Sequence, residues 1–214
     1  TDGKVNLTVR RPKEGEKMQL LDGKEIQPHK DAVLICSADT PIALGGVMGG
    51  GNSEVAENTK RVVLECATFD MYNIRKTSMI HGVFTDAVTR FNKGQPAAQL
   101  PSVLHKAVQM FEELAGAHMV GEIVDCINPS AKEDLQPKSI NVTAAFINNR
   151  LGAQFTAEEI SVLLTNVEFK TSIDSDEITV TPPFWRTDID IAEDIVEEVG
   201  RLFGFDRLSI TLPQ

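Results

Sequence analysis

The chain has 214 residues, a formal net charge of −10 and an isoelectric point near 4.9, which argues against a protein built mainly to neutralise nucleic-acid phosphates. Its ordinary apolar content excludes wholesale disorder, and no apolar run approaches the roughly 20 residues of a membrane span. The length allows one or two domains, and because the chain begins with Thr1 we expect it to be a fragment of a longer polypeptide.

The first part of the chain, up to about residue 66, has the pattern of a β-rich region. Apolar and polar side chains alternate over residues 5–10, as in a half-buried strand, and residues 32–36 form a continuous apolar run that suits a buried strand. Asp22-Gly23 marks a turn. Strands are therefore expected at residues 5–10, 18–21, 32–36 and 61–65, while residues 41–44 lead into the loop that follows.

A glycine-rich loop runs from Gly45 to Gly51. A phosphate-binding loop needs a lysine and then a serine or threonine after its last glycine, whereas Gly51 is followed by Asn52. The positive charge and the magnesium-binding hydroxyl are both missing, so the loop argues against a nucleotide site. The glycines instead predict a place where the backbone comes close to a ligand or a neighbouring strand.

After residue 70 the pattern becomes helical. Residues 71–80 are expected to form a helix, and residues 96–117 form the clearest helix, with Pro96 in its first turn and Gly116 at its end. Its apolar residues recur at the spacing of one helical face: Leu100, Val103, Leu104, Ala107, Val108, Phe111 and Leu114. Residues 120–127 then have the pattern of a strand.

A polar segment with two prolines, Asn128 to Pro137, is interpreted as a linker to a second unit. In that unit Thr156 and Glu159 form a capping-box pattern at the start of a helix. The expected elements are a strand at 140–142, a helix at 143–151 closed by Gly152, a helix from 156, a hairpin of 168–172 with 177–181, and a helix at 191–203. These patterns predict two α+β domains.

The three cysteines, Cys36, Cys66 and Cys126, are far apart and form no CxxC pair. Each lies in an apolar stretch, which predicts buried, reduced thiols rather than disulfides or a metal site.

Two segments of the first unit contain candidate polar groups. Glu65 lies inside the apolar run 62–66, where it is either a buried carboxylate that needs a partner or a solvent-facing residue of an alternating strand. The sequence does not choose between the two. The segment from His81 to Ala87 shows no nucleophile with a suitably spaced histidine and acid.

An acidic cluster stands out in the second unit. Asp194, Glu197 and Glu198 lie at i, i+3 and i+4 of a predicted helix and share one face, and Asp188 lies just before it. Carboxylates of this kind suit Mg²⁺. A solvated acidic helix face explains the same spacing, and spacing alone favours that reading.

Ten stretches of the chain resemble one known family. They are Glu14-Gly15-Glu16, Leu20-Leu21-Asp22-Gly23, Ala43-Leu44-Gly45-Gly46-Val47-Met48-Gly49-Gly50, Val63-Leu64-Glu65-Cys66-Ala67, Lys76-Thr77-Ser78, Thr85-Asp86-Ala87, Arg90-Phe91, Lys93-Gly94, Pro183-Phe184-Trp185-Arg186-Thr187-Asp188 and Glu193-Asp194-Ile195-Val196-Glu197-Glu198-Val199. In order, and over nearly the whole chain, they resemble the β subunit of bacterial phenylalanyl-tRNA synthetase. Met79-Ile80, where the family usually has two basic residues, and Asn92, in place of a common glutamate, depart from its pattern.

The resemblance implies an α+β fold in three parts. Residues 1–128 would be a β-rich editing domain with a long helix, truncated at its N-terminus, because the family's domain begins upstream and carries further pocket residues there. Residues 129–136 would be a linker, and residues 137–212 a small winged-helix-like domain.

The resemblance also implies a function, which is hydrolysis of tyrosine wrongly attached to tRNA(Phe). An editing pocket can select tyrosine by hydrogen-bonding the one hydroxyl that phenylalanine lacks. Glu65 would accept that hydrogen bond, Thr85 and Ala87 would line the pocket, and Gly46 and Gly49 would leave room for the substrate. No residue is assigned as the water-activating, catalytic group.

The implied assembly is a cytoplasmic αβ heterotetramer, with two copies of each subunit, that charges tRNA(Phe) using ATP. Asp188, Asp194, Glu197 and Glu198 fall on positions that hold a Mg²⁺ shared with the α subunit, which favours the metal reading of the acidic cluster. The activating site belongs to the α subunit, so the fragment alone is not expected to charge tRNA. The alternatives are a non-catalytic module that braces the α subunit or binds RNA, and a stand-alone editing hydrolase.

Overall fold

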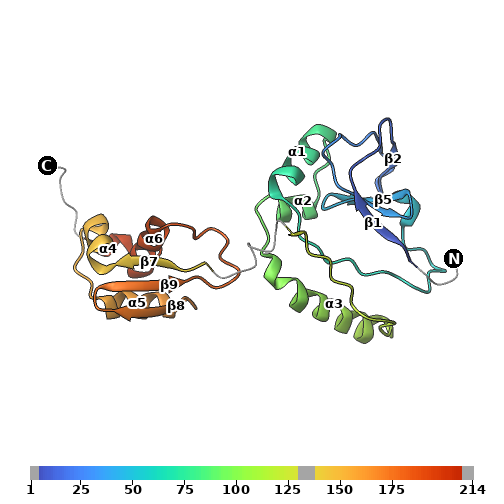
Figure 1. Ribbon diagram of the computed structural model, residues 1–214. Coiled ribbons are helices and arrows are strands. Elements are labelled where there is room, and N and C mark those ends of the chain that lie inside the picture. Colours follow the sequence, from blue (N-terminus) through green and yellow to red (C-terminus); the bar gives the residue numbers. More distant parts are fainter. Residues whose placement is uncertain (1–4, 130–137, 209–214) are drawn as a thin grey trace. The chain divides into compact units, whose positions relative to one another are not determined.

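The computed structural model describes residues 5–129 and 138–208 (Figure 1). The chain divides into two compact units, Thr1–Ala117 and His118–Gln214. The expected linker at 129–136 lies, apart from residue 129, outside the described residues, and the domain bounds remain a prediction. Both units combine antiparallel sheets with helices, which confirms the predicted α+β class.

The first unit is built on a four-stranded antiparallel sheet in the order β1-β4-β5-β6. Its strands are β1 (Leu7–Arg10), β4 (Leu34–Ser37), β5 (Thr40–Leu44) and β6 (Met48–Gly49). A small hairpin of β2 (Met18–Gln19) and β3 (Glu25–Ile26) joins the glycine loop through an isolated bridge between Leu20 and Gly50. The strands expected at residues 5–10, 18–21 and 32–36 are thereby confirmed, with small shifts at their ends, and β5 is a strand that was not predicted.

The helices of the first unit follow the sheet in sequence. They are the 3-10 turn η1 (Gly51–Ser53), α1 (Met71–His81), α2 (Asp86–Phe91), the 3-10 turn η2 (Ala97–Gln99) and α3 (Leu100–Ala115). Asp70 caps α1 by accepting a hydrogen bond from the Asn73 N–H, and Gly82 ends it in the left-handed conformation. The buried core combines sheet residues such as Leu34 and Leu44 with Ile74 of α1 and Val88 of α2.

Two predicted strands are wrong. The structure assigns no strand to residues 61–65 or 120–127, and none of the strands in the described residues pairs with either segment. Val62 is 51% exposed and Val124 is 85% exposed. An apolar run does not become a strand without a neighbour to complete its backbone hydrogen bonds. For the same reason Cys126 is exposed, against the prediction, whereas Cys36 is buried; all three thiols are free.

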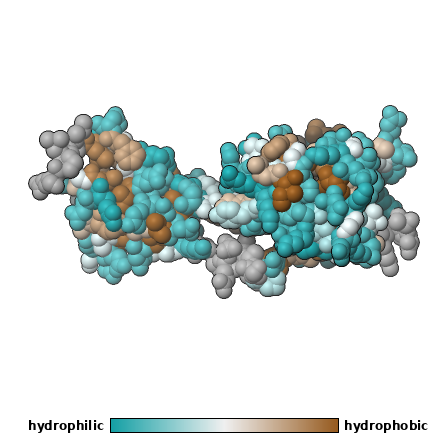
Figure 2. Space-filling model, turned by 90° about the horizontal axis from the view of Figure 1, so that it is seen from above, coloured by the Kyte–Doolittle hydropathy of each residue, from teal (hydrophilic) through white to brown (hydrophobic). Residues whose placement is uncertain are grey.

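The long helix α3 is confirmed, but it begins at Leu100, after the separate turn η2. None of its residues is fully buried, although one face is apolar. Hydrophobic residues reach the surface of both units (Figure 2), and those of α3 include Val103, Phe111 and Leu114.

The second unit packs three helices against a three-stranded antiparallel sheet in the order β7-β9-β8. Its elements are β7 (Ile140–Thr143), α4 (Ala144–Leu151), α5 (Ala157–Thr165), β8 (Lys170–Asp174), β9 (Glu177–Thr181), α6 (Ala192–Phe203) and the 3-10 turn η5 (Phe205–Arg207). Two helices between the first strand and a hairpin give the order expected of a winged-helix-like domain. Thr143 caps α4, and Thr156 with Glu159 forms the predicted capping box of α5.

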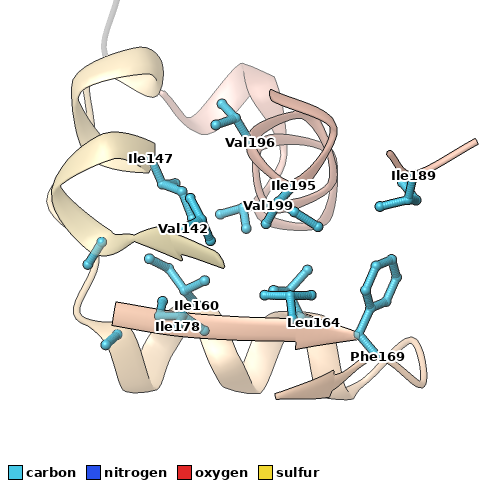
Figure 3. Packing of buried hydrophobic residues seen from close by; sticks show 13 residues of the cluster. Val142, Ile147, Ile160, Leu164, Phe169, Ile178, Ile189, Ile195, Val196 and Val199 are labelled. Carbon is cyan, nitrogen blue, oxygen red and sulfur yellow. The ribbon is translucent and has the colours of Figure 1, made fainter. Parts of the chain in front are cut away.

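The core of the second unit draws on every one of its helices and on β7 and β9 (Figure 3). Ile147, Ile160 and Ile195, from α4, α5 and α6, and Ile178, from β9, are fully buried. Val199 extends the buried face of α6 by one turn, so the face opposite the core is the part of α6 left for polar residues.

Candidate functional site

A cavity of about 570 Å³ opens in the first unit. The glycine loop, residues 65–69, α2 and the start of α3 all contribute to its wall. Of the five residues that the resemblance assigns to a pocket, four line this cavity: Gly46, Gly49, Glu65 and Ala87. Segments separated by up to some 40 positions in sequence therefore meet at one site.

The glycines of the loop are required by close packing within the protein itself. Gly46 has a φ of +70°, and a Cβ added there would lie 2.6 Å from Ile74 Cδ1 and 2.8 Å from Phe69 Cδ2. A Cβ added at Gly49 would lie 2.9 Å from Leu21 Cδ1. The resemblance predicts that these glycines leave room for a substrate, whereas in the structure they leave room for Phe69, Ile74 and Leu21, and their backbone lines the cavity.

The wall of the cavity has an aromatic part. Phe69 and Phe91 both line it, and their rings meet edge to face with centroids 5.2 Å apart. Such a pair offers the apolar surface that an aromatic ligand buries.

Glu65 contributes a carboxyl group to the wall of the cavity. The residue is exposed, yet partial burial raises the pKa of its carboxyl. Within the described part of the chain no hydrogen bond or ion pair engages this carboxyl. It is thus neither a paired buried acid nor the outward-facing residue of a strand, but an acid at the mouth of a cavity with its hydrogen-bonding capacity unused.

Thr85 holds the site together. Its Oγ1 donates a hydrogen bond to the Val47 carbonyl of the glycine loop at 2.8 Å and accepts one from the Val88 N–H at 3.2 Å, which caps α2. Thr85 is not among the residues that line the cavity. Its hydroxyl is already used to fasten the loop to α2, so it positions the wall.

The polar side of the wall was not predicted from the sequence. Asp86, Arg90, Gln95 and Gln99 line the cavity, and the Gln95 amide donates to the Arg90 carbonyl at 3.0 Å. The available signal was a Thr85 cap followed by an acidic residue, the pattern of a helix start. At six residues, α2 is too short to show a helical period.

The acidic cluster of the second unit is organised around arginines. Arg186 donates to both Asp188 oxygens, at 2.8 and 2.6 Å, and to Glu198 Oε1 at 2.9 Å. Arg201 donates to Glu198 Oε2 at 2.6 Å. The interpretation of the cluster as a solvated helix face is wrong for Glu198, whose side chain is only 5% exposed. Two arginines neutralise it, and a paired charge tolerates burial.

The other two acids are placed differently. Asp194 Oδ2 accepts hydrogen bonds from the backbone N–H groups of Asp190 and Ile191, at 2.8 and 2.9 Å, and so caps the start of α6. Glu197 is exposed. Over residues 5–129 and 138–208 no three acidic, histidine or cysteine side chains form a group that could hold a metal ion.

The residues as placed do not fit the Mg²⁺ that the resemblance implies. The oxygens of Asp188 and Glu198 are taken by guanidinium groups, and one Asp194 oxygen by the backbone. The hydrogen bonds from Arg186 lower the pKa of both Asp188 and Glu198 and raise that of Arg186 itself. Mg²⁺ needs free oxygens in near-octahedral order, so the shared metal site remains a prediction.

No helix in the described residues is long and apolar enough to cross a membrane.

Comparison with known proteins gives the family. The B3/4 domain family matches residues 2–116, and the tRNA synthetase B5 domain family matches residues 140–205. The phenylalanine–tRNA ligase beta subunit of Geobacillus kaustophilus (strain HTA426) is 39% identical over 211 residues, covering 99% of this chain and 26% of the relative. That of Latilactobacillus sakei subsp. sakei (strain 23K) is 38% identical over 207 residues, covering 97% of this chain and 25% of the relative.

The chain spans about a quarter of the length of these relatives. A solved N-terminal fragment of the phenylalanyl-tRNA synthetase beta subunit from Pyrococcus horikoshii aligns with a TM-score of 0.44 at 15% identity, covering 92% of this chain and 56% of that one. The two domain matches and the two relatives indicate the same family. The chain therefore belongs to the phenylalanyl-tRNA synthetase β-subunit family, of which it carries the B3/4 and B5 domains.

Proposed function

We propose that the cavity of the first unit is the site at which tyrosine is hydrolysed from mischarged tRNA(Phe). The observation that carries the proposal is the unpartnered carboxyl of Glu65 on the wall of a cavity that also presents Phe69 and Phe91. An aromatic side chain would bury its ring against these two, and its phenol would donate to Glu65.

The same chemistry explains the selection of tyrosine over phenylalanine. A site built to bond a hydroxyl leaves its polar group unpaired when the hydroxyl is missing, and a buried unpaired polar group is costly. Phenylalanine in the cavity would cover Glu65 without bonding it. The cognate product, Phe-tRNA(Phe), would therefore bind more weakly than the mischarged one.

The second unit is proposed to join the β subunit to the α subunit in the αβ heterotetramer that charges tRNA(Phe). Glu198 holds Arg186, in the segment before α6, and Arg201, on α6, in fixed positions. The membership of the chain in the β-subunit family supports this role.

The test is Tyr-tRNA(Phe) deacylation by the full-length αβ enzyme. Glu65→Ala removes a hydrogen bond to a charged acceptor, worth about 1.5–3 kcal/mol, and should slow Tyr-tRNA hydrolysis roughly ten- to a hundredfold. Phenylalanine activation, measured by pyrophosphate exchange, should stay near the wild-type rate. If Tyr-tRNA is cleared equally by both enzymes, Glu65 has no such role, and a bracing or RNA-binding module becomes the better description of this unit.

A further inference from the structure

Thr68 carries a buried hydroxyl with no partner. In the described residues only three buried side-chain atoms lack a hydrogen bond: Arg10 Nε, Thr68 Oγ1 and Asn92 Oδ1. Of these three residues, Thr68 is the one that lines the cavity. A buried hydroxyl without a partner destabilises the folded chain, and buried polar groups are otherwise almost always bonded. A ligand bound in the cavity would supply the missing hydrogen-bond partner of the Thr68 hydroxyl.

Thr68 lies on the same wall segment as Glu65, three residues later. Both line the cavity, and Phe69 follows directly. The two polar groups are chemically complementary, because an ionised carboxylate only accepts hydrogen bonds whereas a threonine hydroxyl also donates one. A ligand hydroxyl that donates to Glu65 still has lone pairs to offer, and Thr68 has a proton to give.

We propose that Thr68 is a second substrate-binding residue of the cavity, which donates a hydrogen bond to the phenol oxygen of a tyrosyl group. This inference rests on the proposed function and adds to it a residue that fixes the side-chain specificity. The phenol would then be satisfied on both sides, as donor to Glu65 and as acceptor from Thr68. A phenylalanyl ring offers neither bond and would leave both groups unpaired.

The side chain can present its hydroxyl without a change of backbone. Rotation about the Cα–Cβ bond from one staggered position to another moves the Thr68 hydroxyl to the place of the methyl group, and the methyl group to the place of the Cβ hydrogen. In its observed position the hydroxyl has no hydrogen-bond partner among the described residues, so rotation away from that position breaks no hydrogen bond. A ligand that supplies an acceptor would favour the rotated form.

The experiment measures binding of L-tyrosinamide and L-phenylalaninamide to the 214-residue chain by NMR titration. The amides mimic the uncharged carbonyl end of an aminoacyl ester. Wild type should prefer tyrosinamide, and Thr68→Val, which keeps the shape of the side chain, should reduce that preference roughly two- to tenfold. Thr68→Ser, which keeps the hydroxyl, should retain it.

The control is Thr8→Val, a substitution of an exposed threonine on β1 whose side chain makes no hydrogen bond within residues 5–129 and 138–208. It should leave the preference unchanged. A second readout is the melting temperature without ligand: Thr68→Val should not lower it, because the change removes an unpartnered hydroxyl.

Three results would overturn the inference: no preference for tyrosinamide in the wild-type chain, the same preference in Thr68→Val as in wild type, or an equal loss for both amides. These outcomes are separate from the proposed function, which stands or falls on the effect of Glu65→Ala in Tyr-tRNA deacylation by the full-length enzyme. If Glu65→Ala impairs deacylation while Thr68→Val leaves the preference for tyrosinamide unchanged, only the inference about Thr68 is contradicted.

Discussion

Two glutamates, one in each unit, have carboxyl pKa values that are shifted in opposite directions. Burial without a partner raises the pKa of Glu65 at the mouth of the cavity. Glu198, which is more deeply buried, is held by Arg186 and Arg201, and its pKa is lowered. A glutamate side chain therefore has a different role in each of the two units. An acid with unused hydrogen-bonding capacity is available to a ligand, whereas one with every oxygen engaged holds the fold together.

The largest expected effect tests the structural role of Glu198. Glu198→Ala leaves two arginines without their buried partner and should lower the free energy of unfolding by about 3–5 kcal/mol. Urea unfolding followed through the fluorescence of Trp185, the single tryptophan of the chain, measures it.

The matched control is Glu193→Ala, because Glu193 pairs with Arg150 at 3.1 Å with both side chains about half exposed. An exposed pair contributes about 0–1 kcal/mol. If the two substitutions cost the same, burial of the ion pair does not give Glu198 a larger structural role than an exposed glutamate of the same helix.

The next effect concerns the glycine loop that forms the cavity wall. Gly46→Ala places a Cβ within 3 Å of Ile74 and Phe69 at a positive φ, so it combines backbone strain with overpacking. Gly15→Ala, at a φ of +72° with nothing within 4 Å, meets the strain alone. Gly46→Ala should therefore cost about 1–3 kcal/mol more than Gly15→Ala in urea unfolding followed by circular dichroism. If the two substitutions lower the free energy of unfolding equally, Phe69 and Ile74 can move to accommodate the added Cβ at position 46.

The smallest effect is a dependence on pH, and its sign differs between the two glutamates. The folded-state pKa of Glu65 is raised, so above the ordinary carboxyl pKa the unfolded chain has lost the proton while the folded chain still binds it. The contribution of Glu65 to stability therefore falls as pH rises through that window. Glu198, with a lowered pKa, contributes stability that is present above its ordinary pKa and is lost as pH falls through the folded-state pKa.

Substitution by glutamine separates the two cases. The unfolding free energy of Glu65→Gln relative to wild type should increase between pH 4 and pH 7, and that of Glu198→Gln should decrease over the same range. Unfolding curves at four or five pH values would show this. Parallel curves for Glu65→Gln and wild type would contradict the raised pKa.

The sequence predicted best those elements whose signals are local. Thr156 with Glu159 gave the start of α5, and Gly152 the end of α4, because caps are formed by residues within one turn. The gathering of Gly46, Gly49, Glu65 and Ala87 was expected from resemblance alone. No periodicity could supply it, since the four residues meet only through the fold.

What the sequence could not supply depends on contacts between distant residues. The apolar run at 61–65 resembles a strand in composition, yet no strand in the described residues pairs with it, and its last residue, Glu65, lines the cavity. The spacing of Asp194, Glu197 and Glu198 was consistent with a metal site, but it does not contain Arg186, which lies 12 positions before Glu198 and engages it. The lack of a hydrogen-bond partner for the Thr68 hydroxyl among the described residues likewise cannot be predicted from the sequence, because it depends on which residues surround it.

Thr85 bears on how this protein tolerates change over evolution. Its hydroxyl donates to the glycine loop and accepts from α2 with one oxygen atom. Serine can do both, whereas alanine or valine can do neither and an ionised aspartate only accepts. Sequence drift at this position should therefore be confined to serine and threonine. A kinetic defect caused by any other residue at position 85 would report a displaced loop, and would be misread as the loss of a substrate contact.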